Sequence, residues 1–528
     1  MIVAGPISSG KTTLATSISK KFGMRVIKTK ELIKNSLGDV QRAGRISLQD
    51  QGEKLDRETK GEWVVDELAK IALSDEKDAA YIIDSARIPE QVIAIKRAFP
   101  RVTLVYLTAS DSELRRRYNE RAAREGDTVP YDTAKQNTTE KLVGRLAEIA
   151  DIVIDTEHCT DDDVFVRATS RMSLYGHDSG FVDVLVGGQF GSEGKGQIVN
   201  YLAREYDVIV RVGGPNAGHT VTEADDAPYV YHLIPSGART HHAHYVLSPG
   251  MVIDVEKLLK EIAECKLDLK DLSIDPNVMT ISEEDPPSEE ELFRRIGSTR
   301  QGVGAATARR ITDRGKDSVV TAGKVKELEH YIRPTYEVMF EALSQNKHIL
   351  IEGTQGTGLS LYHGEYPYVT SRDTTVAGCL SEVGIAPARV RRVVMVCRTY
   401  PIRVESPPAA TSGHFSKDID WGIVSERCGI PRKQLEDQEH TSTTGRKRRV
   451  GEFDWRLLRQ ATFLNGPTDV ALTFADYLSA KNANAVRFEQ LQSETIEFIE
   501  EVERVAGAPV SLISTGRGDR HVIDRRAW

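Results

Sequence analysis

Apolar and polar positions along this chain form two patterns, short apolar runs and longer amphipathic stretches. Short apolar runs, such as Ile2–Ala4 and Val102–Leu107, have the length and composition of buried strands. Between such runs lie helical stretches, the amphipathic Ile198–Arg204 among them. Strands that alternate with helices predict an α/β protein built on mostly parallel sheets. Further strands are predicted at Tyr81–Asp84, Asp151–Asp155, Val182–Val186 and Asp207–Val212, and a further helix at Thr13–Lys21.

The length favours more than one domain. A chain of 528 residues is too long for one ordinary hydrophobic core, so two or three domains are expected. The polar, glycine-containing stretch SLYGHDSG at residues 173–180 has the composition of a linker. We therefore expect an N-terminal domain of residues 1–172 and a second domain of residues 181–528.

A complete phosphate-binding loop follows the first predicted strand. Residues 5–12 read GPISSGKT, which fits the pattern GxxxxGK[ST] between a strand and a helix. The amides of such a loop cradle phosphates, the lysine reaches the outer phosphates, and the hydroxyl holds magnesium. The residues expected to do this are Gly5, Gly10, Lys11, Thr12 and Thr13, with Thr12 as the magnesium ligand.

Two later features of the first domain support a nucleotide site without deciding its chemistry. Asp84 ends a predicted strand, where a carboxylate would orient magnesium and water, although a plain strand-ending aspartate fits as well. The helix after Val102–Leu107 carries arginines that form either a phosphate-clamping lid or a solvated face. Together with IIDSARIPEQ at residues 82–91, these features resemble nucleoside or nucleotide monophosphate kinases. They do not identify the molecule that would accept the phosphoryl group. The arginines are Arg115, Arg116, Arg117, Arg121 and Arg124.

Two more glycine loops follow neighbouring strands of the second domain. GGQFGSEGKG at residues 187–196 leads from a strand into a helix, and GGPNAGHT at residues 213–220 follows the next strand. Backbone amides and a helix N-terminus are thereby directed at an anion, at the sheet edge where ligands bind in open α/β folds. The first loop is not a Walker A motif, because Gln189 replaces the leading glycine and Gly196 follows the lysine.

These loops resemble the phosphate loop and the following AGH loop of the adenylosuccinate synthetase family. The resemblance covers roughly residues 181–528 and implies a ligase in which a nucleoside triphosphate phosphorylates the 6-oxygen of a purine nucleotide, after which L-aspartate displaces the phosphate. It also implies Mg²⁺ and a homodimer. Five later segments resemble the family in the same order: IGSTRQGVG (296–304), IEGTQGTGLSLYHGEYPYVTSRDTT (351–375), TSTTGRKRRVGEFD (441–454), LTFAD (472–476) and LISTG (512–516).

The resemblance assigns roles to individual residues. Lys195 would neutralise the triphosphate, His219 would act as general acid on the migrating phosphoryl group, and the Gly218 carbonyl would join the magnesium shell, with Ser192 beside it. Alone, the RKRR stretch at residues 446–449 is also typical of nucleic-acid patches, but guanidinium groups after a threonine-glycine turn suit a carboxylate better. The nucleotide and substrate set is Gly191, Glu193, Gly194, Gly196, Asn216, Ala217, Thr299, Gln355, Thr370, Asp476 and Gly516, and the aspartate set is Thr443, Thr444, Arg446 and Arg448.

Two departures from the family pattern bear on the substrate. Ser192 stands where the family has its catalytic aspartate, and a hydroxyl is no comparable base for the purine N1 proton, whereas it leaves room for a guanine 2-amino group. Phe474 stands where the family has a lysine beside the guanine of GTP. The chain is in this respect similar to the phage-type subgroup that uses dGMP with ATP or dATP. Ordinary synthesis from IMP and GTP, and a nucleotide sensor without turnover, remain alternatives.

Composition narrows the setting. The net charge of -8 argues against a dedicated nucleic-acid binder. Five cysteines without a CxxC pair suit a reduced cytoplasm, and no apolar run of about 18 residues predicts a membrane span. The acidic, proline-containing stretch Ile281–Glu291 is predicted to be an exposed loop.

Overall fold

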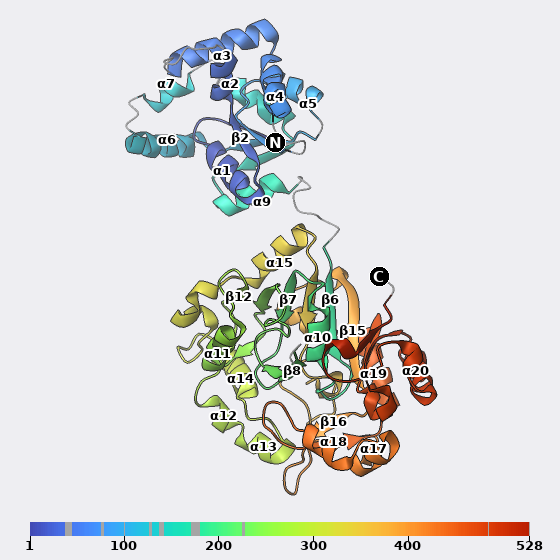
Figure 1. The fold of residues 1–528 in the computed structure, drawn as a ribbon. Helices are drawn as coiled ribbons and strands as arrows, with labels where there is room; N and C mark the ends of the chain where they lie inside the picture. Colours follow the sequence, from blue (N-terminus) through green and yellow to red (C-terminus); the bar gives the residue numbers. More distant parts are fainter. Residues whose placement is uncertain are drawn as a thin grey trace. The chain divides into compact units, whose positions relative to one another are not determined.

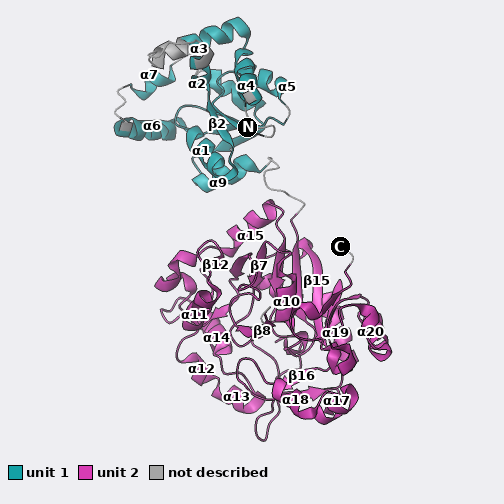
Figure 2. Ribbon diagram, in the orientation of Figure 1, with its two compact units in different colours: residues 1–175 teal, residues 176–528 magenta. Residues whose placement is uncertain are grey.

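A computed structural model of the chain describes residues 1–36, 45–74, 79–99, 101–125, 129–136, 142–170, 180–223, 227–483 and 485–526. The chain divides into two compact units, Met1–Tyr175 and Gly176–Trp528, which are coloured separately in Figure 2. The expected linker, 173–180, lies outside the described residues except for Gly180. Both units are α/β with parallel sheets, which confirms the predicted fold class (Figure 1).

Unit 1 is built on a five-stranded parallel sheet in the order β2-β3-β1-β4-β5. Neighbouring residues of β1 face opposite cores, because Ile2 packs with α2, α4 and α5, whereas Val3 packs with α1 and α9. The strands are β1 (Ile2–Ala4), β2 (Arg25–Lys28), β3 (Tyr81–Asp84), β4 (Leu104–Thr108) and β5 (Ile152–Asp155). The helices are α1 (Lys11–Phe22), α2 (Thr29–Ser36), α3 (Arg45–Thr59), α4 (Trp63–Ser74), α5 (Pro89–Ala98), α6 (Asp111–Glu125), α7 (Tyr131–Lys135) and α9 (Asp161–Thr169).

Unit 2 is built on a nine-stranded sheet in the order β12-β10-β7-β14-β6-β15-β19-β20-β21. Every pairing from β12 to β20 is parallel, and only the edge strand β21 runs antiparallel. The strands are β6 (Val182–Gly187), β7 (Val208–Arg211), β10 (His244–Leu247), β12 (Leu272–Ile274), β14 (Ile349–Glu352), β15 (Val390–Arg398), β19 (Asp469–Thr473), β20 (Val510–Ser514) and β21 (Val522–Asp524).

Helices cover both faces of this sheet, as a parallel sheet requires. Side chains of α10 and α11 pack with Leu185 on one face, and those of α15, α16, α19 and α20 pack with Val184 and Val186 on the other. The bounds are α10 (Lys195–Ala203), α11 (Val255–Cys265), α14 (Val303–Thr312), α15 (Thr335–Ser344), α16 (Val376–Val383), α17 (Trp421–Cys428), α18 (Arg432–Gln438), α19 (Trp455–Asn465) and α20 (Ser493–Ala506). Smaller strands are β8 (His219–Thr222), β9 (Pro228–Tyr231), β16 (Ile402–Val404), β17 (Asp418–Ile419) and β18 (Arg448–Gly451).

The stretch predicted to be an exposed loop is helical and partly buried, so that prediction was wrong. It forms α12 (Asp285–Ser288) and the start of α13 (Glu290–Ile296). The buried Glu289 accepts hydrogen bonds from the amides of Gly302 (3.0 Å) and Gly304 (2.8 Å) at the start of α14, which explains why an acid is inside. Among the described residues, no helix has the length and apolar composition needed to cross a membrane.

Candidate functional site

The predicted ligase residues of unit 2 gather at the carboxyl ends of its parallel strands. The two glycine loops leave β6 and β7 at the same edge, but the expectation that these strands are neighbours was wrong, because β14 lies between them and pairs with both. On the other side of β6, the ends of β15, β19 and β20 follow in order. Segments far apart in the sequence therefore meet at one edge, which is where ligands bind in open α/β folds.

The loop between β6 and α10 surrounds the carboxylate of one of its own residues, Glu193. The buried carboxylate of Glu193 accepts hydrogen bonds from the amides of Gln189 (3.1 Å) and Gly191 (2.8 Å) and lies 2.5 Å from the Lys195 ammonium. Gly191 and Gly194 have φ angles of 87° and 86°, a conformation that glycine adopts without strain. Amides and an ammonium that converge on one carboxylate have the arrangement that a phosphate group requires.

His219, at the end of the second glycine loop, belongs to a buried charged cluster. Its Nδ1 lies 2.6 Å from Oε1 of Glu352 and 2.8 Å from Nη1 of Arg211. Arg211 is also 2.7 Å from the same carboxylate oxygen. Burial raises the pKa of Glu352, but Arg211 and His219 outweigh burial and hold that pKa at about 2. The carboxylate is therefore ionised and lies beside Arg211 and the imidazole.

The cluster leaves one nitrogen of His219 for a ligand. Burial, helped by Arg211, lowers the pKa of His219 to about 3, so the ring is neutral at physiological pH. Arg211 can only donate, so Nδ1 either donates to Glu352 or accepts from Arg211, and in the second case Nε2 carries the proton. Nε2 is buried and forms no hydrogen bond with the described residues. A neutral ring with this tautomer can donate a hydrogen bond to a phosphoryl oxygen.

Ser192 lies against the predicted aspartate loop. Nη2 of Arg448 donates to its hydroxyl at 3.1 Å, and Nη1 of Arg398 donates to its carbonyl at 3.3 Å. Both arginines are held by buried Glu439, which lies 2.9 Å from each guanidinium. Burial raises the pKa of Glu439, but Arg398 and Arg448 outweigh it and lower the pKa to about 2. Glu439 is thus an ionised anchor for the arginine beside Ser192.

Glu439→Gln is expected to raise the KM for L-aspartate about 10-fold with a smaller change in kcat, because the neutral amide fixes Arg448 less firmly. Steady-state kinetics with varied L-aspartate measure this split. Glu436→Gln is the matched control, since Glu436 pairs with Arg432 on the exposed side of α18. An unchanged KM in the Glu439 variant would show that the anchor is purely structural.

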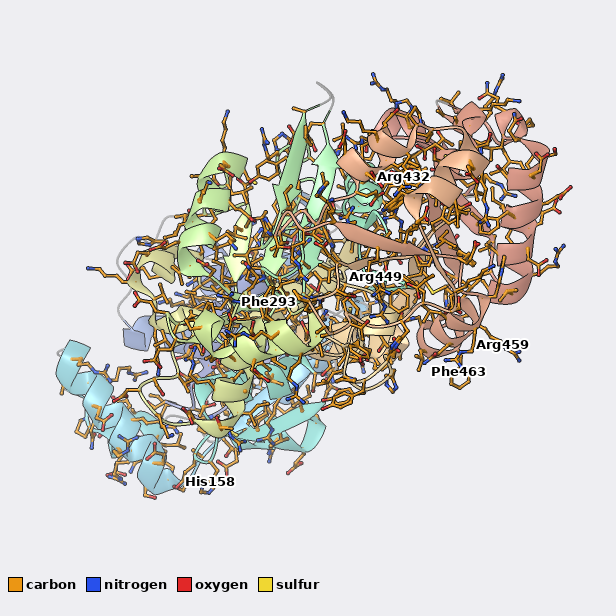
Figure 3. The ribbon with its side chains drawn as sticks, turned by 90° about the horizontal axis from the view of Figure 1, so that it is seen from below. His158, Phe293, Arg432, Arg449, Arg459 and Phe463 are labelled. Atoms are coloured by element: carbon orange, nitrogen blue, oxygen red, sulfur yellow. The ribbon has the colours of Figure 1, made fainter. Side chains whose placement is uncertain are left out.

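The aspartate loop and the second glycine loop touch. The Ser442 hydroxyl donates to the Gly218 carbonyl at 3.0 Å, and Thr444 lies 2.7 Å from Thr441, oxygen to oxygen. Arg446 points elsewhere, donating to the Gly297 carbonyl at 3.1 Å, with its guanidinium 5.1 Å from the ring centre of Phe293, which Figure 3 labels. Of the predicted aspartate residues, Arg448 is therefore placed beside Ser192, and Arg446 beside the segment that contains Thr299.

The predicted nucleotide residues are only partly joined by hydrogen bonds. Asn216 donates to the Thr370 hydroxyl at 3.5 Å, and its own buried carbonyl oxygen has no partner among the described residues. Gln355 has a φ of 56°, and its side-chain oxygen Oε1 accepts a hydrogen bond from the Thr354 hydroxyl at 2.9 Å. Among the described residues, the Thr299 side chain forms no hydrogen bond with Asn216, Thr370 or Gln355. Gly196 packs against His219, because a Cβ on Gly196 would lie 2.7 Å from that histidine, and the Ala217 carbonyl accepts a hydrogen bond from Arg211 at 3.5 Å.

The predicted base-recognition strand ends in an unusual residue. Phe474 follows β19 with a φ of 59°, and the Arg398 guanidinium lies 4.0 Å from its ring centre. Burial raises the pKa of Asp476 to about 6, although Arg398 and Arg517 oppose this shift. Gly516 follows the neighbouring strand β20 and accepts a hydrogen bond from Ser514 at 2.9 Å. Asp476 and Gly516 therefore lie at adjacent strand ends.

Both units offer oxygen donors that suit Mg²⁺, which would neutralise phosphate charge when bound. In unit 2 the expected donors are the Gly218 carbonyl, which accepts from Ser442, and the Ser192 hydroxyl, which accepts from Arg448. In unit 1, the Thr12 hydroxyl lies 2.9 Å from Oδ2 of Asp84. No group of three or more His, Cys, Asp and Glu side chains that suits a metal occurs in the described ranges. Such sparse donor sets fit a cation held largely by phosphates.

Close packing behind the glycine loops limits which residues fit there. A Cβ on Gly213, whose φ is 93°, would lie 2.1 Å from the Thr354 hydroxyl. Gly213→Ala is expected to lower the free energy of unfolding by about 2–4 kcal/mol, combining backbone strain with a clash. Thermal unfolding with Gly384→Ala as control measures the difference, since Gly384 has a φ of 80° but open space around it. Equal losses in both variants would contradict the clash.

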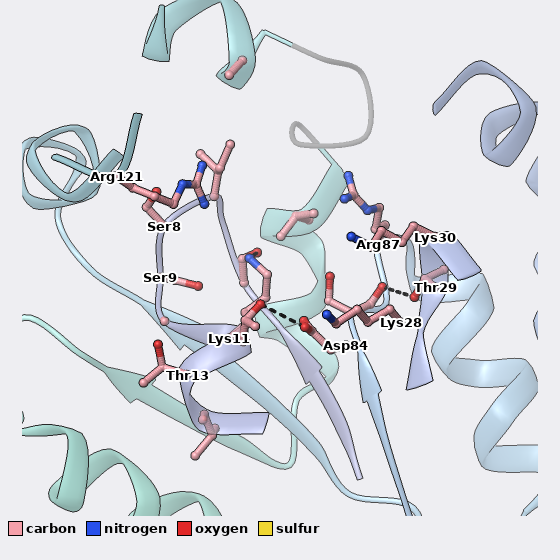
Figure 4. A pocket seen from close by; sticks show the side chains of 18 of the residues that line it. Ser8, Ser9, Lys11, Thr13, Lys28, Thr29, Lys30, Asp84, Arg87 and Arg121 are labelled. Carbon is pink, nitrogen blue, oxygen red and sulfur yellow. Dashed lines mark hydrogen bonds between the residues drawn. The ribbon is translucent and has the colours of Figure 1, made fainter. Parts of the chain in front are cut away.

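Unit 1 holds a separate cavity of about 1260 Å³ around its phosphate-binding loop (Figure 4). Lys11 is folded back onto the loop and donates to the carbonyls of Gly5 (2.9 Å) and Pro6 (2.7 Å). Gly5 must be glycine, because a Cβ there would lie 2.2 Å from the Leu107 carbonyl. Gly10 precedes Lys11 with a φ of 92°, and Thr13 lines the cavity behind it.

The structure divides the arginines of α6 into two groups. Arg117, Arg121 and Arg124 line the cavity. Arg115 instead forms two hydrogen bonds with Asp132 (2.6 and 2.7 Å), and Arg116 pairs with Glu113 and Glu120 on the surface. The solvated face is thus observed for Arg116, whereas the phosphate-clamping lid stays a prediction for the arginines that line the cavity.

Four important residues were not singled out from the sequence. Arg211, Glu352 and Arg398 each end an apolar strand, and Glu439 precedes the aspartate loop. A charged residue that continues an apolar strand is the signal that identifies the first three, because a buried charge requires a partner.

Comparison with known proteins agrees with this geometry. The family model described as adenylosuccinate synthetase matches residues 184–321 and 318–486, which is more than half of the chain. The chain belongs to the adenylosuccinate synthetase family. Unit 2 is accordingly a C–N ligase of the adenylosuccinate synthetase type. A second model, described as an AAA domain, matches residues 1–146 and agrees with the P-loop fold of unit 1.

Adenylosuccinate synthetases of archaea are among the relatives. The Methanocaldococcus jannaschii enzyme is 37% identical over 351 residues, which cover 65% of this chain and 96% of the relative. The Pyrococcus horikoshii enzyme is also 37% identical over 351 residues, with 98% of the relative covered. Both matches account for unit 2 nearly whole and leave unit 1 outside.

Two solved structures resemble the synthetase unit. Cyanophage S-2L succinoaminodeoxyadenylate synthetase, bound to dGMP and dATP, is 28% identical with a TM-score of 0.56 over 66% of this chain and 96% of that chain. Fully ligated adenylosuccinate synthetase from Plasmodium falciparum, 23% identical with a TM-score of 0.58 over 66% of this chain and 100% of that chain, shares the fold.

Proposed function

We propose that the synthetase unit joins L-aspartate to the 6-position of dGMP, using ATP or dATP as the phosphoryl donor. The observation that carries this proposal is Ser192, a hydroxyl 3.1 Å from Arg448 at the position where the family has a catalytic carboxylate. A small neutral group there leaves room for the 2-amino group of guanine. The likeness to the cyanophage synthetase, which was solved with dGMP and dATP, supports the same choice.

The remaining residues have matching roles in this proposal. Lys195 and the loop amides would hold the triphosphate, with Mg²⁺ as the cation. His219 would donate from Nε2 to the migrating phosphoryl group. Arg448 and the threonines Thr443 and Thr444 would hold the L-aspartate carboxylates. The family resemblance extends the proposal to a homodimer that acts on small molecules in the cytoplasm, without nucleic acid.

Phe474 supports ATP or dATP over GTP. A lysine beside guanine is absent, and the ring at this position is already covered by the Arg398 guanidinium at 4.0 Å. An adenine lacks the N1 and 2-amino donors of guanine, so its binding does not require an acidic partner such as Asp476.

A second candidate is ordinary adenylosuccinate synthesis from IMP and GTP, which the names of the 37% identical archaeal relatives favour. The two are separated by incubating the full chain with Mg²⁺ and L-aspartate while crossing dGMP, GMP and IMP against ATP, dATP and GTP. Product masses are then recorded. A succinyl adduct from dGMP with little from IMP supports the proposal, and turnover of IMP alone overturns it. Tight binding without any turnover would instead indicate a nucleotide sensor.

A further inference from the structure

The cavity of unit 1 is large enough for two ligands. At about 1260 Å³ it exceeds the range of roughly 300–1,000 Å³ that one drug-sized ligand ordinarily fills. Its phosphate-binding loop accounts for one end. The other end is formed by residues after β2 and β3 and by α3, α4 and α5, which the phosphate-binding loop motif does not explain.

Positive charge lines both ends of the cavity. Of the described lining residues, eight are Lys or Arg and four are Asp or Glu, so the wall favours a total ligand charge that is strongly negative. Figure 4 shows Arg121 on one side of Lys11, and Arg87, Lys28 and Lys30 on the other side. The second group lies away from the α6 arginines and therefore serves a second anionic group.

The second end is a built site rather than a chance cluster of surface lysines. Gln91, which is 2% exposed, donates to Oδ1 of Asp56 at 2.8 Å and accepts from the Arg87 amide at 3.0 Å. Buried Trp63 donates to the same Asp56 oxygen at 2.7 Å. These bonds tie α3, α4 and α5 together and fix the backbone that carries Arg87. Thr29, beside Lys28, is fixed by a 2.7 Å hydrogen bond to the Ser85 carbonyl.

We propose that unit 1 is a phosphotransferase whose acceptor is a nucleoside monophosphate, with the acceptor phosphate bound by Lys28 and Arg87 and its nucleoside lying towards Asp56 and Trp63. A neutral nucleoside would not need cations at this end. Two carboxylates that line the cavity, Asp84 and Asp56, are already hydrogen-bonded to Thr12 and to Trp63 and Gln91. An ionised phosphate oxygen needs no general base, which suits this arrangement.

The reaction balances without any further reagent. An oxygen of the acceptor phosphate forms a bond to the γ-phosphorus of a nucleoside triphosphate, and the bond from that phosphorus to the β,γ-bridging oxygen breaks. The bonding electrons leave with the bridging oxygen, so that two nucleoside diphosphates are formed. Lys11 and the α6 arginines stabilise the charge of the group in transfer.

The test uses the full chain with Mg²⁺-ATP and no L-aspartate, so that the synthetase unit cannot form its product. The acceptors are dGMP, dAMP, dCMP and dTMP, each beside its deoxynucleoside, and products are identified by mass. Deoxynucleoside diphosphate from at least one monophosphate is expected, and its loss in Lys11→Ala assigns the activity to unit 1. Phosphorylation of deoxynucleosides instead, or ATP hydrolysis without transfer, would overturn the proposal.

Variants of the acceptor end locate the binding of the monophosphate. Arg87→Ala and Lys28→Ala are each expected to raise the KM for the monophosphate about 10-fold or more while the KM for ATP stays within about 2-fold. Lys20→Ala is the matched control, because Lys20 is exposed on α1 and does not line the cavity. If Arg87→Ala does not fold, Arg87→Gln gives the same readout. An equal rise in both KM values would contradict the assignment.

Discussion

Replacement of His219 with alanine is expected to lower kcat of the synthetase unit by about 10³-fold, with the KM for L-aspartate changed only a few-fold. The imidazole is buried, its pKa is lowered to about 3 by burial, and Nδ1 lies 2.6 Å from Glu352 and 2.8 Å from Arg211. Only Nε2 remains for the phosphoryl group, so its removal affects the transition state rather than binding of L-aspartate. Steady-state kinetics with the preferred nucleotide measure both constants.

The control for this prediction is His242→Ala, since His242 is an exposed residue of unit 2 that takes no part in the cluster. A second variant, Glu352→Gln, tests the cluster: it keeps the size of the side chain but removes the negative charge that pairs with Arg211, the residue that donates to Nδ1 in the tautomer with the proton on Nε2. It is expected to lose part of the activity that His219→Ala loses. If His219→Ala retains kcat within about 10-fold, the phosphoryl group is stabilised by other residues and the role of His219 is wrong.

The sequence predicts the location of the site better than it predicts how its side chains are held. Glycine loops after apolar strands were sufficient to place Lys195 and His219 at one edge of the unit 2 sheet, because the carboxyl ends of parallel strands share an edge. The same reasoning placed Lys11 at the corresponding edge of the separate sheet in unit 1. The cluster of Arg211 and Glu352 could not be predicted in the same way, since it depends on β7 and β14 being neighbours in the sheet. A sequence shows that a charge ends a strand, but not which other charge it meets.

Burial of acids is the second point at which sequence patterns failed. Glu289 lies in an acidic stretch that reads as exposed, yet it caps the amides at the start of α14. Glu439 precedes the aspartate loop without any hydrophobic signal and nevertheless holds two arginines and Tyr477. Charge runs report average exposure, whereas a single carboxylate goes inside when enough donors surround it.

Ser192→Asp is expected to shift the ratio of kcat/KM for IMP to that for dGMP by about 10²-fold in favour of IMP, which is roughly 2.7 kcal/mol of transition-state discrimination. The new carboxylate would supply a base for the purine N1 proton and would crowd the 2-amino group of guanine. The backbone at residue 192 has a φ of 55°, a conformation that aspartate tolerates, so the variant should fold. Competition assays with both nucleotides, analysed by product mass, measure the ratio directly.

The matched variant Ser192→Ala separates space from hydrogen bonding. It removes the hydroxyl that accepts from Arg448 at 3.1 Å but adds no bulk, so dGMP should remain the preferred acceptor even if turnover falls several-fold. An unaltered ratio in Ser192→Asp would mean that residue 192 does not select the base. Selection would then have to come from elsewhere in the nucleotide pocket, and Asn216 is the first residue to test, because its buried carbonyl oxygen has no partner among the described residues and is an acceptor for the guanine donors.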